Sequence, residues 1–196
     1  FDGTVLRYQA SHSFTVDLLG TKNTAQADAK APDDTGFYFG GLYTTYQPKK
    51  TYRLDVYALG EWNRKQTMKD EDDLRRITFG TYDRGELDAI DYEVEVAAQI
   101  GKRYNPGSKQ RETVSAFMLT GALGYTLDIE QKPRLAIGYD YLSGRGEADE
   151  DYTVFDTLFA TNHKFYGFMD YFVNIPVHTS GAGLQDVMAK FQIHPH

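Results

Sequence analysis

Residues 52–63 read Tyr-Arg-Leu-Asp-Val-Tyr-Ala-Leu-Gly-Glu-Trp-Asn, and their side chains alternate between two kinds. Successive side chains of an extended chain point to opposite faces, so a period of two is typical of a β-strand. One face of this strand is mostly apolar and the other is mostly polar. The apolar face carries Tyr52, Leu54, Val56, Ala58, Gly60 and Trp62, and the opposite face carries Arg53, Asp55, Tyr57, Leu59, Glu61 and Asn63.

The aromatic residues at the two ends of the apolar face, Tyr52 and Trp62, set a length for this strand. Their separation is roughly 33 Å, at about 3.3 Å per residue. A strand tilted by about 40° then covers roughly 25 Å of a membrane, close to the apolar band of an outer-membrane barrel, with aromatics at both interfaces. Soluble antiparallel sheets also alternate, but their strands are typically about five or six residues long. The spacing therefore favours a transmembrane strand.

The same alternation recurs along the chain, whereas helical periodicity is hard to find. In residues 92–102, for example, Val94 and Val96 oppose Glu93 and Glu95. The pattern predicts nine strands, at residues 3–9, 12–19, 36–46, 52–63, 75–82, 92–102, 114–127, 134–142 and 184–193.

The predicted connections alternate between short and long. The short ones are residues 10–11, 47–51, 84–86 and 130–133, and the long ones are 20–35, 64–74, 103–113 and 143–183. In an up-and-down sheet the short connections then share one end and the long ones share the other. Short periplasmic turns and long extracellular loops are typical of outer-membrane barrels. We therefore predict an all-β protein, an antiparallel up-and-down transmembrane β-barrel.

Composition excludes several classes of protein. The 196 residues contain no cysteine, so disulfides and thiolate chemistry are excluded. The net charge of −7 argues against a nucleic-acid-binding protein. With 15 tyrosines, 12 phenylalanines and 18 glycines, the chain favours β structure. No apolar run approaches the roughly 18 residues that a transmembrane helix needs, and the first residues show no signal-peptide pattern.

The second half of the chain contains more distinctive runs. Residues 133–144 read Pro-Arg-Leu-Ala-Ile-Gly-Tyr-Asp-Tyr-Leu-Ser-Gly, and 155–167 read Phe-Asp-Thr-Leu-Phe-Ala-Thr-Asn-His-Lys-Phe-Tyr-Gly. Residues 183–190 read Gly-Leu-Gln-Asp-Val-Met-Ala-Lys. These runs resemble a strand, a long-loop signature and the following strand of the alginate-export family of outer-membrane porins. Residues 1–3 and 42–48 are similar to the same family more weakly.

This resemblance implies a single-chain barrel of about eighteen strands. It also implies residence in the outer membrane of a Gram-negative bacterium, and export of an anionic polysaccharide or passage of other solutes. The nine predicted strands are about half of such a barrel, and bacterial single-chain barrels normally have an even number. We therefore expect residues 1–196 to form one segment of barrel wall, a fragment of a larger barrel domain.

In a barrel, the polar face of each strand points into the lumen. Arginine and lysine there could select anions and bind carboxylates transiently, while interspersed carboxylates keep the binding weak. The alternative is that opposite charges on neighbouring strands pair and fill the interior. The candidate pore-lining residues are Arg53, Asp55, Glu61, Arg76, Arg84, Glu93, Glu95, Arg134, Asp140 and Lys190.

Two features of the long loops carry further hypotheses. The run 161–166 is unusually aromatic for a loop, and we consider Asn162, His163 and Lys164 as a constriction that contacts the solute. The same run could instead be a packed plug or the start of another strand. The acidic clusters 70–73 and 147–151 could bind calcium or be bridged to lipopolysaccharide, but they match no calcium-loop motif, so we expect solvated loop charge.

No motif indicates an enzyme: Gly-x-Ser-x-Gly, His-Glu-x-x-His and phosphate-binding loops are absent. We expect no catalytic residue, metal site or cofactor. The expected function is a porin-like channel for passive passage or export of a hydrophilic, anionic solute such as a uronate polysaccharide. Its expected partners are outer-membrane lipid and lipopolysaccharide. The alternative is a soluble β-sandwich that binds carbohydrate or a protein, which requires Leu54, Val56 and Val94 to be buried in a core. A membrane-embedded barrel enzyme would need a nucleophile and a base that the sequence does not supply.

Overall fold

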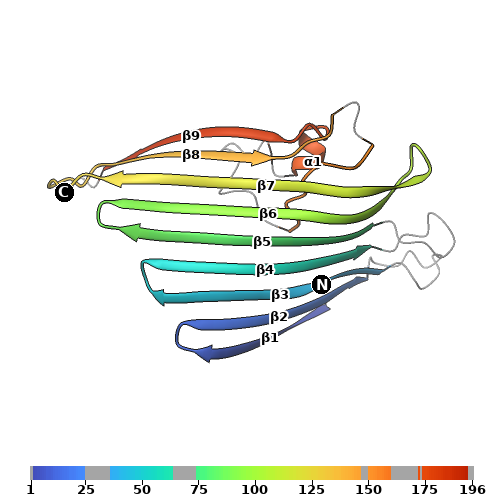
Figure 1. Ribbon diagram of the computed structural model, residues 1–196, viewed down its shortest axis with the longest axis horizontal. Coiled ribbons are helices and arrows are strands. Elements are labelled where there is room, and N and C mark those ends of the chain that lie inside the picture. The colour runs from blue at the N-terminus through green and yellow to red at the C-terminus, as the bar shows by residue number, and fades with distance from the viewer. Residues whose placement is uncertain are drawn as a thin grey trace.

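The computed structural model describes residues 2–24, 36–63, 74–146, 150–159, 172 and 174–193. Within these residues the chain forms nine strands in one antiparallel sheet, in the order β1 to β9 (Figure 1). The strands are β1 Asp2–Ser11, β2 Phe14–Thr24, β3 Gly36–Lys49, β4 Tyr52–Asn63, β5 Leu74–Leu87, β6 Ile90–Asn105, β7 Gln110–Thr126, β8 Arg134–Leu142 and β9 Leu184–Gln192.

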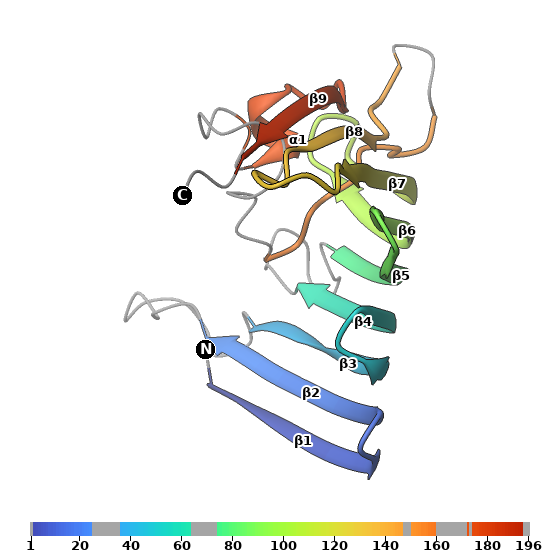
Figure 2. The same cartoon turned by 90° about the vertical axis from the view of Figure 1, so that its left-hand side faces the viewer.

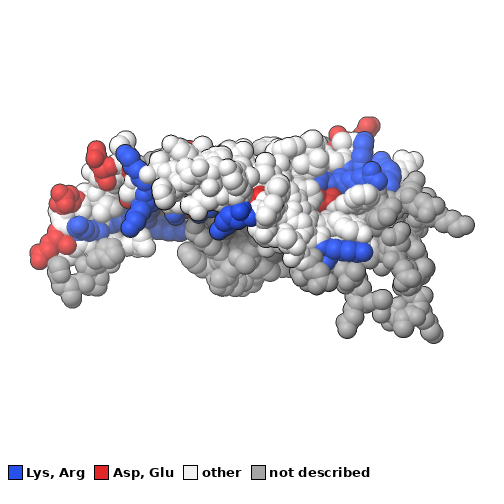
Figure 3. Space-filling view, turned by 90° about the horizontal axis from the view of Figure 1, so that it is seen from below, with Lys and Arg blue, Asp and Glu red and all other residues white. Residues whose placement is uncertain are grey.

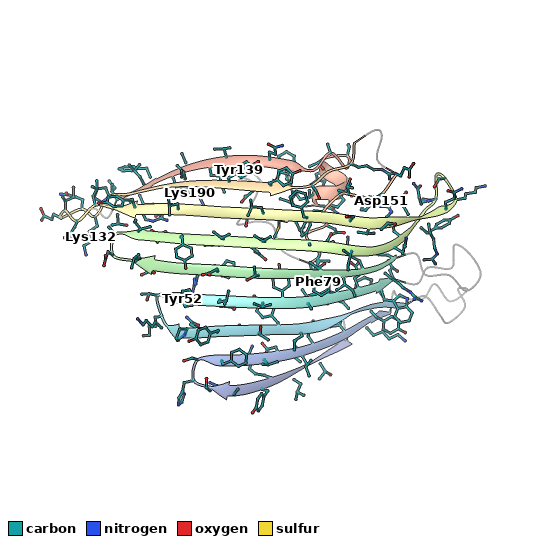
Figure 4. The ribbon with its side chains drawn as sticks, in the orientation of Figure 1. Tyr52, Phe79, Lys132, Tyr139, Asp151 and Lys190 are labelled. Carbon is teal, nitrogen blue, oxygen red and sulfur yellow. The ribbon has the colours of Figure 1, made fainter. Side chains whose placement is uncertain are left out.

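Each strand pairs with its neighbours in the sequence, which gives the up-and-down order that the sequence predicted. The turns after β1, β3, β5 and β7 lie at one end of the sheet, and the even-numbered strands end at the other (Figure 1). We call these the short-turn end and the long-loop end. Lys132 lies toward the first end and Asp151 toward the second (Figure 4).

Three predicted connections were wrong. Residues 10–11 belong to β1, and the turn is His12-Ser13. Residues 84–86 belong to β5, which stays paired with β6 up to Leu87 and Ile90. The turn is therefore Asp88-Ala89, and Asp88 adopts a positive φ of 53°. Residues 103–113 are mostly strand as well, because β6 and β7 remain paired up to Asn105 and Gln110. Polar residues of this kind are typical of a loop, but here they extend the hydrogen-bonded ladder of β6 and β7 beyond the apolar part of the sheet.

The sheet is curved, and its concave side carries non-strand segments (Figure 2). These are residues 152–159 and the short helix α1, Ile175–His178. The apolar cluster on this side contains Phe155 and Ile175 from the connection between β8 and β9. They pack with wall residues Ala97, Ala116, Met118 and Leu142.

The convex face is apolar and exposed. Val56 is 51% exposed and Val94 is 38% exposed, and both lie on this face. In the view from below, the upper margin, which is the convex side, is largely uncharged between its two ends (Figure 3). The sandwich alternative is contradicted, because it requires these residues to be buried, and the described residues form a single sheet. An extended apolar surface of this kind indicates contact with lipid or another protein.

Aromatic side chains of the convex face concentrate toward both ends of the strands, as the spacing of Tyr52 and Trp62 predicted. Figure 4 shows Tyr52 near the short-turn end of β4. Such paired belts are typical of proteins that cross a bilayer. By position along each strand, the short-turn belt contains Tyr8, Phe14, Tyr46, Tyr52, Tyr92, Tyr125 and Phe191, the long-loop belt contains Tyr38, Trp62 and Tyr141, and Phe79, Phe117 and Tyr139 lie between the belts.

Among the described residues, no helix has both the length and the hydropathy required to cross a membrane.

Candidate pore-lining wall

The ten candidate pore-lining residues all lie on the concave face. Register determines this, because directly paired residues of neighbouring strands point to the same side of a sheet. For example, Glu61 pairs with Arg76, and Ala136 pairs with Lys190. The sequence therefore assigned the correct face to each of these side chains, although a solute-contacting role stays a prediction.

Near the short-turn end of β4, Arg53 and Asp55 form an ion pair that two tyrosines extend across the wall. Arg53 Nη2 lies 2.8 Å from Asp55 Oδ2, and Tyr43 Oη donates to the same oxygen at 2.7 Å. Tyr43 stacks on Tyr57 with ring centroids 5.6 Å apart, and Tyr57 Oη donates to Glu95 at 2.7 Å. Because Asp55 is only 1% exposed, its charge depends on these donors.

Toward the long-loop end, Arg76 joins the wall to the connection between β8 and β9. The Arg76 guanidinium is bound by Glu61 and lies 2.9 Å from Asp156 Oδ2. The Gln99 side chain donates to the Asp156 carbonyl at 2.7 Å and accepts from the Asp156 amide at 3.0 Å. With Arg76 4% exposed and Gln99 fully buried, these groups form a satisfied polar network.

The segment 152–159, which we call the inner segment, is hydrogen-bonded along the concave side. It begins beside β7, where Tyr152 forms an isolated parallel bridge with Val114. The guanidinium of Arg103 lies 3.8 Å from the centre of the Tyr152 ring. Further along, the Phe155 amide donates to the Ser143 carbonyl at 2.9 Å. The inner segment thus lies against the concave wall.

The predicted constriction residues Asn162, His163 and Lys164 lie outside the described residues. The inner segment, residues 152–159, belongs to the same long connection, and the constriction stays a prediction. Sequence reasoning missed Asp156 and Gln99. Asp156 belongs to the family-like run 155–167, but only its ion pair with the distant Arg76 shows that it joins the connection to the wall.

At the short-turn end, a hollow of about 460 Å³ has a charged lining that includes Arg84, Asp91, Glu93 and Arg134. Arg134 Nε donates to Asp91 Oδ2 at 2.7 Å, and Arg134 Nη1 donates to Gln192 at 3.3 Å. Since the Arg134 side chain keeps a quarter of its surface exposed, at 25%, it can still meet an anion. Asp91 was not among the predicted residues, although its polar position in the alternating β6 pattern was readable.

Asp140 of β8 also faces the concave side, opposite Asp186 of β9 in register. Lys190 lies four residues further along β9, on the same face. Like charges directly opposite each other are unfavourable in a sheet. Asp140 is 2% exposed, so this part of the wall offers it little contact with solvent.

The sequence model of one protein family, described as alginate export, matches residues 1–193 of this chain. The match covers nearly the whole sequence. The chain belongs to the alginate export family. This is a family of outer-membrane export channels and not one of enzymes, and the nine-stranded antiparallel sheet fits that architecture. A search of curated proteins found no match.

Proposed function

We propose that residues 1–196 form part of the wall of an outer-membrane channel through which a hydrophilic, anionic solute such as a uronate polysaccharide passes without energy input. The division between the two faces of the sheet carries this proposal. The convex face is apolar, whereas the concave face holds Arg53, Arg76, Arg84, Arg134 and Lys190. An apolar exterior and a charged interior are what a channel in lipid requires.

The open sheet supports a larger barrel. In the described residues, β1 and β9 are the two edge strands and each pairs on one side only. An unpaired backbone edge in hydrocarbon costs several kcal/mol for each unsatisfied group. We therefore propose that further strands cover both edges in a membrane and that this chain is one segment of a larger barrel domain.

The arginines of the wall suit transient binding of carboxylates. A guanidinium binds a carboxylate through two parallel hydrogen bonds. Arg53 and Arg134 are oriented by Asp55 and Asp91 and are still partly exposed. A uronate carboxylate can share such a guanidinium, while the wall carboxylate competes and promotes release. Weak binding at several sites is what conduction needs.

The test is ion selectivity of the full-length protein in planar bilayers. We expect Arg134→Glu to lower the anion-to-cation permeability ratio by about fivefold, because reversing a charge near the ion path changes the ion's energy by about 1 kcal/mol in water. Arg53→Glu should act in the same direction. Arg84→Glu is a second variant for this region, because Arg84 is exposed and its loss leaves no buried partner.

Lys132→Glu is the matched control, because it makes the same charge change in an exposed turn. Reversal potentials that stay the same in the three arginine variants would contradict the selectivity role. The charges would then only pair with one another and fill the wall. A full-length protein that is soluble and monodisperse without detergent would contradict the channel itself.

A further inference from the structure

A row of basic and aromatic side chains crosses the convex face near the long-loop end. Each member is the direct cross-strand partner of the next, so all share one level and one face. From β2 to β7 the row contains three cations and no carboxylate, and Asp2 of β1 is the direct partner of Lys22 at its edge. We call it the basic–aromatic row, and its members are Lys22, Tyr38, Trp62, Arg75, Lys102 and Thr113.

Contacts within the row orient its cations. Lys22 Nζ lies 5.4 Å from the centre of the Tyr38 ring, and the guanidinium of Arg75 lies 4.8 Å from the centre of the Trp62 ring. Lys102 Nζ donates to Thr113 Oγ1 at 2.8 Å. Cation–π contacts hold a cation near an aromatic ring without neutralising its charge. These positions therefore keep positive charge at the level of an aromatic belt.

A groove lies beside the row, on the side toward the middle of the strands. At this next level, Gly20, Gly40 and Gly60 are direct cross-strand partners. A side-chain carbon added to Gly20 would meet nothing within 4 Å, and one on Gly60 would meet only a backbone oxygen at 3.7 Å. Gly20 and Gly60 thus leave open space on the convex face, whereas a carbon added to Gly40 would lie 2.7 Å from the Leu19 carbonyl oxygen.

The groove has a volume of about 870 Å³. Its lining includes Gly40 and Gly60 together with Ile77 and Ile100, which are 45% and 53% exposed. The row members Tyr38, Trp62, Arg75 and Lys102 also line it. An apolar groove with cations at one end complements an amphiphile that has an anionic head and a hydrocarbon chain.

We propose that this face binds one membrane lipid that bears two phosphates, with one phosphate at Lys22, the other at the neighbouring Arg75 and Lys102, and an acyl chain in the groove. The inference rests on the proposed placement in the outer membrane. Interfacial aromatic belts lie at the depth of lipid headgroups. Lysine and arginine bind phosphate oxygens by charge-assisted hydrogen bonds, and the glycine row admits a chain that side chains would exclude.

Native mass spectrometry of the full-length protein in detergent tests the site, with bisphosphorylated lipid A as the probe. Basic residues near a charged lipid surface contribute about 1 kcal/mol each. We therefore expect the triple variant Lys22→Gln, Arg75→Gln, Lys102→Gln to bind the probe roughly a hundredfold more weakly. The matched control is Lys49→Gln, Lys50→Gln, Lys132→Gln, which removes three charges at the short-turn end and should bind as the wild type does.

Two further arms separate the sources of the phosphate. Gly60→Leu fills the groove and should weaken binding of lipid A but not of water-soluble glucosamine bisphosphate. Equal competition by the soluble phosphosugar, or unchanged binding in the triple variant, would overturn the lipid site. If the protein needs detergent and conducts ions but shows no preference for lipid A, the lipid site is contradicted and the proposed channel is not. If the protein is soluble without detergent, both the lipid site and the proposed channel are contradicted.

Discussion

Arg76 shows how one residue couples the wall to a distant segment. Its guanidinium is almost fully buried between Glu61 and Asp156, which is 80 residues away in the sequence. Buried charges are tolerated when they are paired and hydrogen-bonded, and removing one member leaves the others uncompensated. The position of the inner segment, residues 152–159, therefore depends on this single side chain more than on the exposed arginines of the same face.

Arg76→Leu should lower the free energy of unfolding by about 3–5 kcal/mol, because Glu61 and Asp156 would lose their buried partner. It should also raise amide hydrogen exchange in the inner segment. Asp156→Asn is the milder variant, since it keeps the backbone bonds to Gln99, and it should raise the exchange without the full loss of stability. Urea titration and exchange mass spectrometry measure the two effects.

Arg84→Leu is the control for this prediction, because Arg84 is an exposed arginine on the same strand and face. Its effect on stability should stay within about 0.5 kcal/mol. Exchange in the inner segment that is unchanged in Arg76→Leu would show that other contacts hold the segment.

At the scale of the elements, register and the close fit between β4 and β5 decide where wall side chains lie. Tyr57 and Gly80 are direct partners on the concave face. A side-chain carbon added to Gly80 would lie 2.1 Å from the Tyr57 ring. The ring thus occupies the space that the glycine leaves, which is how aromatic residues stabilise glycine positions in sheets. This fit orients the Tyr57 hydroxyl toward Glu95.

Gly80→Ala should therefore displace the Tyr57 ring, break its hydrogen bond to Glu95 and cost about 1–3 kcal/mol of stability. The change can be measured by urea unfolding in detergent, monitored by tyrosine and tryptophan fluorescence. Gly20→Ala is the matched control on β2, where nothing lies within 4 Å of the added carbon. Equal effects of the two substitutions would show that the Tyr57 ring does not depend on Gly80.

At the scale of the whole molecule, the two faces of the sheet belong to different environments. The convex face exposes apolar side chains between two aromatic belts, and the concave face holds buried ion pairs and the inner segment. A soluble sheet that is covered on one side buries its apolar face. Here the arrangement is inverted, as in a barrel that has lipid outside and water inside.

This inversion predicts opposite tolerances for charge. Val56→Arg places a cation at the middle of the convex face and should cost about 2–4 kcal/mol of stability in lipid vesicles. Thr45→Arg lies on the concave face, opposite Asp55, and should cost less than about 1 kcal/mol. Unfolding by urea in vesicles compares them. A larger cost for Thr45→Arg would contradict the assignment of the faces.

The sequence by itself determined the nine strands, their up-and-down order and the face on which each candidate residue lies. The reason is local: the side-chain period of an extended chain is two, so alternation assigns a face without any knowledge of neighbours. The family-like runs in the second half of the chain also identified the family that residues 1–193 match. The strand ends at Leu87 and Asn105 were misjudged, because polar residues continue a ladder as well as they form a loop.

Only the tertiary structure brought Asp156 to Arg76 and Gln99, and only it aligned Lys22, Arg75 and Lys102 across the convex face. Both arrangements depend on which residues of different strands lie side by side, and a shift of one residue would move each side chain to the other face. Cross-strand register and the path of a long connection are settled by contacts between distant residues. Those contacts form only when the whole sheet is assembled, so no local pattern of residues encodes them.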